Sequence, residues 1–381
     1  MDALERAREV AAGWDERLRA GLPSDVEIYD AHTHLGNDID GMVGDYDELV
    51  GGMDRYGIAR ANMFCLDEPE RGPGFRFGND RTLEFAARAG GRLVPFVRLA
   101  LEEGPVEEAT RCLDLGARGI KLHPRAQKFL PHDDRLAPIF ALAAERGVPI
   151  LIHAGRGLPP IAEGLERLVD ANPGTQLILA HAGIADLANL AFRFAGKRGV
   201  FFDTSVWSAV DLSCLLRLVP PEQIIYASDY PYGNFPGALL LALRVARAAG
   251  YDERQMREMF GGTAARITSG GEPLEPSHVA GAPVLSQPLP HARIHQYLST
   301  ARPLLFTGGP DDFEILGLPL NATEEPNGFH REELDQIREL LVAARDLWQV
   351  LPEVAETDRS GARRTTGRLL QIADLIAVTS V

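Results

Sequence analysis

Val26-Glu-Ile-Tyr-Asp-Ala-His32-Thr-His34-Leu-Gly36 is an apolar run that ends in two histidines one residue apart. Alternate side chains of a strand point to the same side, so both imidazoles should project together from the carboxyl end of one strand. Parallel α/β folds carry their chemistry at that end, and two neutral imidazoles supply half of a divalent-metal site. The stretch therefore predicts a buried strand with metal ligands at its end.

The same pattern recurs along the chain. Four further apolar runs end in a polar residue: Gly119-Ile-Lys121-Leu-His123, 148–153 (ending in His153), 176–181 (ending in His181) and 224–229 (ending in Asp229). Three more runs, at 58–66, 93–101 and 200–206, bring the number of predicted strands to eight. Helical stretches are predicted between them at 46–56, 79–89, 105–115, 133–146, 158–171, 184–196, 208–218 and 236–249. This alternation predicts an α/β protein, a (β/α)8 TIM barrel over residues 25–268.

The remaining segments have a different character. Residues 1–24 predict an N-terminal helix, 269–290 a linker rich in Pro, Gly and Ser, and 291–381 a mainly helical C-terminal extension. The helices expected at 331–350 and 360–378 carry apolar stripes: Leu334, Ile337 and Leu341, then Leu369, Ile372, Leu375 and Ile376. Such stripes must be buried, against the barrel shell or in a homo-oligomer. His291, His295 and His330 are interpreted as solvated or capping residues.

Composition narrows the class of protein. The formal net charge of −15 argues against a nucleic-acid or anionic-membrane partner. The three cysteines are too widely spaced for a disulfide framework or a cysteine-based zinc motif. The N-terminal residues do not resemble a signal peptide, and no apolar run approaches membrane-spanning length. A cytoplasmic location with a small-molecule substrate is the expectation.

Six pieces together resemble a known family. They are Asp30-Ala-His32-Thr-His34, Gly119-Ile-Lys121-Leu-His123-Pro, Ile152-His153-Ala-Gly, Ala180-His181-Ala-Gly, Ser228-Asp229-Tyr-Pro and Phe260-Gly-Gly-Thr-Ala-Ala-Arg-Ile. In order and spacing they resemble the amidohydrolase superfamily, specifically the amidohydrolase-related (amidohydrolase 2) family. The resemblance implies a metal-dependent barrel enzyme. It does not fix the substrate, because that family contains hydrolases, decarboxylases and hydratases. Thr263 departs from the Asn that relatives usually carry there.

Four residues are candidate metal ligands. His32, His34, His153 and Asp229 offer three imidazoles and one carboxylate from converging strand ends, which is a donor set for a catalytic ion with an open position. Zinc is the first choice, with manganese or iron as alternatives. A bound metal lowers the pKa of its water from 15.7 to about 7. Asp229 is then expected to bind the metal or to accept the water's proton, and His181 to polarise the substrate, act as an acid or bind a second metal.

Lys121 has three interpretations, all open. It is one of only three lysines beside 36 arginines (39 basic residues in all). Once carboxylated it could bridge two ions, with His32, His34 and Asp229 on one and His153 and His181 on the other. As an ammonium it could hold a substrate carboxylate, or it could be a structural ion-pair partner.

Other residues near strand ends are candidate substrate contacts. His123 is interpreted as a substrate or supporting group. Arg125 and Arg156 could clamp a carboxylate, or be solvent-exposed loop arginines. Trp207 and Tyr232 could form a wall of the binding site, or pack a loop.

The sequence thus predicts a metal-dependent hydrolase of amidohydrolase type that uses metal-activated water on a small, anionic organic substrate. One ion is expected, or two if Lys121 is carboxylated. The first alternative is a non-oxidative, metal-dependent decarboxylase (a lyase) or hydratase on the same site. An alternative of another class is a catalytically inactive barrel that serves as a binding or assembly platform.

Overall fold

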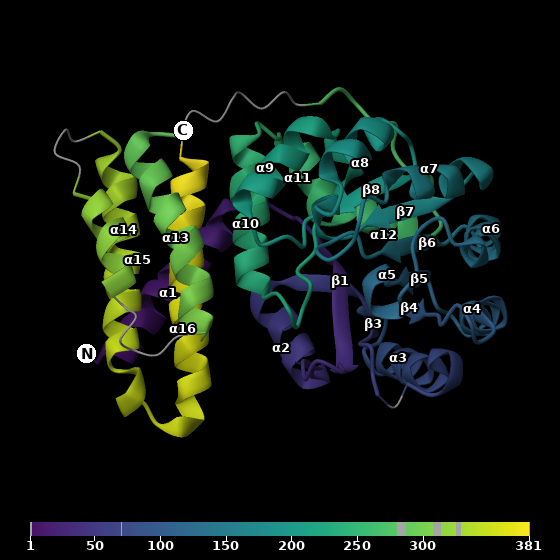
Figure 1. Cartoon of the computed structure of the whole chain (residues 1–381), viewed down its shortest axis with the longest axis horizontal. Helices are drawn as coiled ribbons and strands as arrows, with labels where there is room; N and C mark the ends of the chain where they lie inside the picture. Colours follow the sequence, from purple (N-terminus) through teal and green to yellow (C-terminus); the bar gives the residue numbers. More distant parts are fainter. Residues whose placement is uncertain (1, 70, 280–286, 308–313, 325–328, 381) are drawn as a thin grey trace. The chain divides into compact units, whose positions relative to one another are not determined.

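The computed structural model describes residues 2–69, 71–279, 287–307, 314–324 and 329–380 (Figure 1). The chain divides into two compact units. The barrel unit comprises Pro23–Ala242 and Ala249–Gly281, and the helical unit comprises Met1–Leu22, Leu243–Ala248 and Ala282–Val381. Among the described residues, no helix is both long and apolar enough to cross a membrane.

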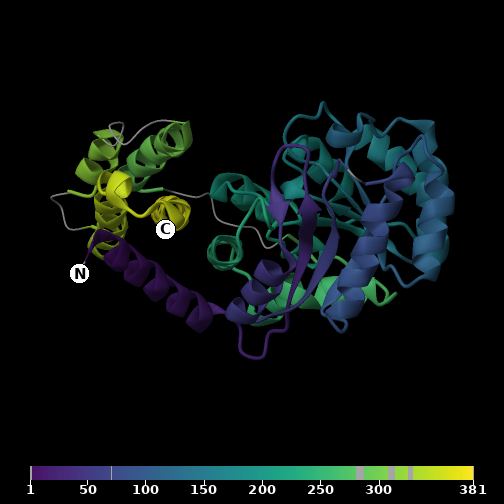
Figure 2. The same ribbon diagram turned by 90° about the horizontal axis from the view of Figure 1, so that it is seen from below.

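Eight parallel strands form the wall of the barrel unit, as predicted (Figures 1 and 2). They are β1 (Ile28–Asn37), β3 (Ile58–Cys65), β4 (Leu93–Arg98), β5 (Gly119–Leu122), β6 (Pro149–Ile152), β7 (Gln176–Leu179), β8 (Val200–Asp203) and β9 (Ile224–Ile225). Consecutive members of this series are neighbours in the sheet. A two-residue strand that was not predicted, β2 (Val43–Gly44), pairs antiparallel with the end of β1.

The two ends of the sheet are joined by backbone hydrogen bonds. Ala31 N–H donates to Tyr226 O at 3.0 Å, and His34 N–H donates to Tyr230 O at 2.7 Å. Asp229 N–H donates to His32 O at 2.9 Å. Because these bonds tie the segment after β9 to β1, a carboxylate and two imidazoles nearly 200 residues apart are held at one place.

A helix follows each barrel strand, which confirms the predicted alternation. The eight are α2 (Tyr46–Tyr56), α3 (Arg76–Arg88), α4 (Pro105–Asp114), α6 (Ala137–Arg146), α7 (Ala162–Ala171), α8 (Leu187–Phe194), α9 (Ala209–Leu218) and α10 (Phe235–Ala248). Local signals set their ends: Asp45 caps α2 by accepting from Glu48 N–H, and Gly57 ends it at φ 69°. Shorter helices and turns are α5 (Pro124–Gln127), α11 (Glu253–Arg257), α12 (Thr263–Thr268), η1 (Pro73–Phe75), η2 (Asp134–Leu136), η3 (His181–Gly183), η4 (Pro221–Gln223) and the π-turn η5 (Glu258–Gly262).

The barrel interior is layered, and on four of its strands an apolar side chain precedes a polar one. The buried cluster includes Phe96, Leu151, Phe201 and Ala227, and each lies two residues before a buried polar residue: Arg98, His153, Asp203 and Asp229. Side chains two apart face the same way, so the polar set forms the upper layer at the carboxyl ends of the strands. On β5 that place is taken by Gly119, where a Cβ would lie 2.3 Å from the Phe96 ring.

The helical unit contains α1 (Ala3–Gly21), α13 (Leu289–Thr307), α14 (Gly317–Ala322), α15 (Arg331–Gln349), η7 (Leu351–Glu353) and α16 (Glu356–Thr379). The predicted extension is therefore helical, although α13 and α14 were not predicted as helices. All seven residues of the two predicted apolar stripes are buried. Arg368 of α16 pairs with Asp15 of α1. The expectation of a solvated or capping His291 is wrong, because its side chain is fully buried.

The predicted linker at 269–290 lies partly outside the described residues. Its described part before residue 280 contains neither helix nor strand, and α13 begins at Leu289, just before its predicted end.

Candidate active site

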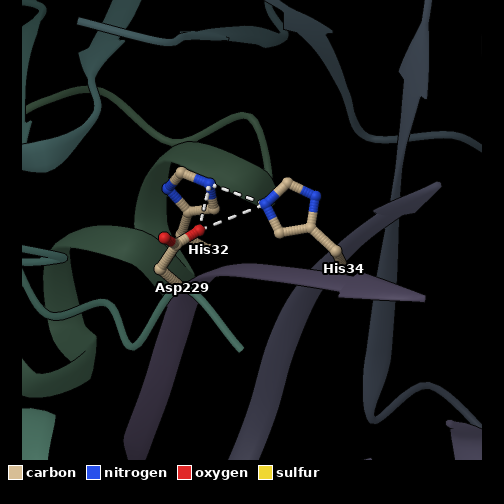
Figure 3. Close-up of side chains that lie close together, drawn as sticks. All are labelled: His32, His34 and Asp229. Carbon is tan, nitrogen blue, oxygen red and sulfur yellow. Dashed lines mark hydrogen bonds and ion pairs between the residues drawn. The ribbon is translucent and has the colours of Figure 1, made fainter. Parts of the chain in front are cut away.

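Three side chains form a compact triangle at the carboxyl end of β1. The Nε2 atoms of His32 and His34 lie 3.1 Å apart. Oδ1 of Asp229 lies 3.3 Å from the first nitrogen and 3.2 Å from the second (Figure 3). All three residues are buried, and they are the one group among the described residues whose ligand atoms are gathered closely enough to hold an ion.

The triangle has the dimensions that a metal requires. Ligand atoms about 2.0 Å from a tetrahedrally coordinated ion are separated by about 3.3 Å, which matches these three edges. Burial, followed by the charge of Lys121, lowers the pKa of His32, and burial also lowers that of His34. Both imidazoles are therefore neutral and can offer a lone pair. The residues present fit a divalent ion.

Asp203, at the end of β8, fixes the orientation of His32. Its Oδ2 accepts a hydrogen bond from Nδ1–H of His32 at 2.8 Å, which leaves the Nε2 lone pair facing the triangle. Its Oδ1 accepts hydrogen bonds from the Ser205 hydroxyl at 2.6 Å and from the backbone N–H of His181 at 2.8 Å. Sequence reasoning missed Asp203. The signal was present, because the run at 200–203 ends in a carboxylate as the other runs end in ligand-type residues.

A second group of imidazoles lies beside the triangle. Nε2 of His181 lies 3.0 Å from Nδ1 of His153, whose ring stacks on His123 with centroids 4.1 Å apart. The His181 ring centroid is 5.1 Å from that of His32. Burial lowers the pKa of His153 to about 2 and lowers those of His123 and His181. The ring of His153 therefore contacts those of His123 and His181. Its role as a metal ligand stays a prediction.

Gly155 permits the close approach of these rings. A Cβ at this position would lie 2.7 Å from Cδ2 of His181 and 3.0 Å from Cε1 of His153. Both distances are at or below the closest normal contact, so any side chain here would displace a ring. This gives a steric reason for the glycine in the His153-Ala-Gly segment.

Lys121 reaches the triangle from β5. Its Nζ lies 3.2 Å from Nε2 of His32 and 4.7 Å from the centroid of the Phe64 ring. The side chain is fully buried, and burial lowers the pKa of Lys121 to about 7. The position suits a carbamate, an ammonium that holds a substrate anion or a structural partner, so the three interpretations stay open.

The backbone aims Asp229 at the triangle. Its φ of 59° is in the left-handed region, where aspartate is tolerated better than most residues. Burial raises the pKa of Asp229 well above its usual value, and the nearby charge of Lys121 opposes that rise. An ion in the triangle would act in the same direction as Lys121 and favour the carboxylate.

A cavity of about 500 Å³ opens onto these residues. Every predicted substrate contact lines it: Lys121, His123, Arg125, Arg156, Trp207 and Tyr232. Arg125 and Arg156 are exposed, and so is half of Trp207. The Tyr232 hydroxyl donates to Asp40 Oδ2 at 3.0 Å. Arg98, which sequence reasoning missed, lines the same cavity although it is 1% exposed. The specific roles of all these residues stay predictions.

Comparisons with known proteins agree with this geometry. Residues 29–267, well over half of the chain, match a family model described as amidohydrolase. No curated protein matches the chain.

Three solved structures illustrate the structural likeness. The 5-carboxyvanillate decarboxylase of Sphingomonas paucimobilis has 16% identity and a TM-score of 0.51, covering 64% of this chain and 99% of its own. The 2,6-dihydroxybenzoate decarboxylase from Rhizobium has 17% identity, a TM-score of 0.50 and the same two coverages. The 5-carboxyvanillate decarboxylase of Novosphingobium aromaticivorans, complexed with manganese, has 14% identity and a TM-score of 0.50, covering 64% of this chain and 96% of its own. At these identities the likeness concerns the fold.

Proposed function

Because the chain belongs to the amidohydrolase family, whose enzymes are metal-dependent, we propose that it is a hydrolase that acts on a small anionic organic molecule. The observation that carries the proposal is the triangle of His32 Nε2, His34 Nε2 and Asp229 Oδ1, with edges of 3.1–3.3 Å. These residues would hold the ion. A divalent ion there would supply Lewis acidity and lower the pKa of a bound water.

The residues in and around the triangle have different proposed roles in proton transfer and in orienting the ligands. Asp229 Oδ1 faces both imidazoles, whereas Oδ2 makes no hydrogen bond to any described residue and lies 4.0 Å from Nδ1 of His181, so Oδ2 is the oxygen proposed to accept a proton from water. Asp203 holds His32 in the tautomer that leaves Nε2 free. The ring of His181 donates Nδ1–H to Ser205 O at 2.9 Å, which leaves a lone pair on Nε2. The role proposed for His181 is to take up a proton there and then to polarise the substrate or return the proton to the leaving group.

Zinc is the proposed ion, since two imidazoles, a carboxylate and an open position are typical of catalytic zinc. Manganese or iron are the alternatives, and the manganese in one structure of similar fold supports the former. One ion is proposed, with a second only if Lys121 is carboxylated and His153 and His181 join it. A cytoplasmic location and assembly into a homo-oligomer stay predictions from the sequence.

A second candidate is non-oxidative decarboxylation at the same site. It is supported by the solved structures of similar fold, since those cited above are decarboxylases. An inactive barrel used as an assembly platform is less well supported, because the metal-ligating triangle is complete.

Product analysis separates the two reactions. The metal-loaded protein is incubated in ¹⁸O-water with small lactones, esters and amides that carry a carboxylate, and with hydroxybenzoic acids. Hydrolysis predicts one ¹⁸O in the product, whereas decarboxylation predicts release of carbon dioxide without net addition of water. The Asp229→Asn protein is the control for contaminating activity. Release of carbon dioxide without any hydrolysis would overturn the first proposal in favour of the second.

A further inference from the structure

We propose that Arg98 binds a carboxylate group of the substrate. The inference rests on the proposed function and deepens it, because it names the anionic group that the cavity receives and the residue that binds it. Arg98 ends β4, and its register partner in the next strand is Lys121. It therefore belongs to the same upper layer of the barrel as the residues around the metal-ligating triangle.

The backbone of Arg98 is fixed from helix α3. Arg98 N–H donates to Asn79 Oδ1 at 2.9 Å, and Asn79 Nδ2–H donates back to Arg98 O at 2.9 Å. Asn79 is itself held by Glu108, which accepts from Nδ2 at 2.9 Å. Both main-chain polar groups of Arg98 are thus satisfied by one buried amide, so the side chain starts from a rigid position.

The guanidinium, by contrast, has no anionic partner among the described residues. Nη1 makes a long hydrogen bond of 3.4 Å to Cys65 O, and the group lies against the Phe75 ring with Cζ 4.8 Å from its centroid. Nε and Nη2 are buried and make no hydrogen bond. Asp67, which also lines the cavity, forms no ion pair with Arg98, and the neighbouring Glu68 pairs with Arg81. A buried charge left unpaired is strongly unfavourable, so the arrangement calls for an anion.

The two free donors define what that anion is. Nε–H and Nη2–H lie on one edge of the guanidinium and point in parallel, which is the side-on fork that receives the two oxygens of a carboxylate. Arg98 is among the residues that line the cavity of the triangle, and its Nε and Nη2 are closed to solvent. The proposal is therefore that a ligand in this cavity pairs its carboxylate with Arg98 beside the candidate metal site. The positive charge of Arg98 acts on the imidazoles of the cavity. Burial and other neighbouring charges lower the pKa values of His34 and His123 most, and Arg98 lowers them further.

Two other arginines of the cavity differ in this respect. Arg125 and Arg156 are exposed, so water already satisfies their charge and the anion gains less from pairing with them. Arg98 is nearly inaccessible to water and held by Asn79, so pairing there is stronger and better oriented. We therefore assign the substrate carboxylate to Arg98 rather than to the two exposed residues.

Calorimetric titration of the full-length, metal-loaded protein with acetate tests the assignment. Acetate is small enough that the shape of the cavity does not exclude it, and acetamide is its uncharged counterpart. Saturable binding of acetate but not of acetamide is expected. Arg98→Lys, which keeps the charge and loses the fork, should weaken acetate binding at least about tenfold. The matched control is Arg60→Lys on β3, an arginine that is already paired with Glu27 and should leave binding unchanged.

Three further measurements keep the outcomes separate. Metal content should be unchanged in Arg98→Lys, and Arg98→Met should raise the melting temperature of the acetate-free protein, because an unpaired buried charge is removed. A structural role would lower it; if the methionine variant fails to fold, the lysine variant decides. Acetate binding that survives His32→Ala/His34→Ala but not Arg98→Lys belongs to Arg98 and not to the metal.

The assignment is overturned if wild-type protein does not bind acetate, if Arg98→Lys binds it normally, or if inorganic phosphate binds more tightly than acetate at the same residue. Failure of the proposed function would appear differently, as absence of bound metal or of hydrolysis while Arg98-dependent binding persists.

Discussion

The barrel unit and the helical unit bury polar side chains in different ways. In the barrel, the buried polar residues at the strand ends keep unsatisfied atoms: Nδ1 of His34, Nε2 of His153, and Nε and Nη2 of Arg98. In the helical unit, α15 and α16 bury aliphatic stripes, and the buried Asp15 is paired with Arg368. Unsatisfied polar atoms around a cavity indicate a ligand, whereas a paired charge between helices indicates packing.

The helical unit also contains buried polar atoms without a hydrogen-bond partner among the described residues, including Nε of Arg359, Nε of Arg368 and both ring nitrogens of His291. His291 is fully buried, and its ring contacts that of His330 at 5.3 Å. Unlike His32 and His34, it belongs to no group of described side chains whose ligand atoms lie close enough together to hold an ion. The contrast therefore lies in convergence: strand ends bring several polar residues to one point, and packed helices do not.

The largest effect should come from removing two corners of the triangle. His32→Ala together with His34→Ala leaves only Asp229, so bound metal and activity should both be lost. Elemental analysis of the purified protein is the measurement. The exposed His132→Ala is the control and should keep its metal. Unchanged metal content in the double variant would show that the triangle does not hold the ion, and the proposed difference between the two units would fail.

Asp229→Asn should remove nearly all turnover while leaving the fold intact. The amide keeps the shape of the side chain but accepts no proton and carries no negative charge toward the ion. We expect kcat to fall by at least about 10²-fold, the lower range for a positioned acid–base group. Kinetics on the substrate found by product analysis, with circular dichroism as a check of folding, provide the measurement. Near-normal turnover would contradict the role given to Asp229.

Much of the barrel could be predicted from the sequence because its signals are local. Short apolar runs bounded by Gly and Pro mark buried parallel strands, and the polar residue at each run's end marks the side where chemistry gathers. The convergence of His32, His34 and Asp229 follows from this pattern once the barrel closes. The additional strand β2 could not be predicted, because two residues carry no periodicity.

What sequence reasoning missed depends on partners distant in the chain. Asp203 matters because it meets His32, 171 residues earlier, and Arg98 because its neighbours leave two donors unpaired. Helix α13 was missed because its sequence has little amphipathic pattern and includes a proline at position 303, which is a helix-breaking signal. Tertiary packing decides these features, and a single sequence does not display it.

Asp203→Asn should have the next largest effect. The amide would place an N–H donor opposite Nδ1 of His32, so the imidazole would turn to the tautomer with its proton on Nε2, inside the triangle. Metal affinity should fall by about 10–100-fold. Competition with a chromophoric chelator measures it, and Asp211→Asn on α9 is the control. Unaltered affinity would mean that Asp203 serves packing only, as Asp15 does in the helical unit.

Gly155→Ala tests whether the second imidazole group needs its close spacing. The added methyl would lie 2.7 Å from the His181 ring, so His153 or His181 must move, and turnover should fall by about tenfold. Gly51→Ala is the matched control. It lies within α2 with no atom near its new methyl, and should stabilise the protein by up to about 1 kcal/mol without changing turnover. Equal turnover in both variants would show that these rings have no catalytic role.

The smallest effect on chemistry should follow removal of the C-terminal extension. A chain ending at Ser269 keeps every residue of the triangle and of the cavity wall, so metal content should be unchanged. The truncated chain lacks helices α13 to α16. Helix α1 then has no packing partners in the helical unit, and its buried residues become exposed: Ala7, Trp14 and Leu18. Newly exposed apolar surface of this kind promotes association. Sedimentation should therefore show lower solubility or a changed oligomeric state.

A second truncated chain, residues 23–269, removes α1 as well and should recover solubility if exposure of that helix is the cause. If the first chain is folded and metal-loaded but inactive, the helical unit contributes to catalysis and the contrast between the two units fails. If it sediments as the full chain does, the helices have no part in assembly, and their buried stripes serve only the stability of their own unit.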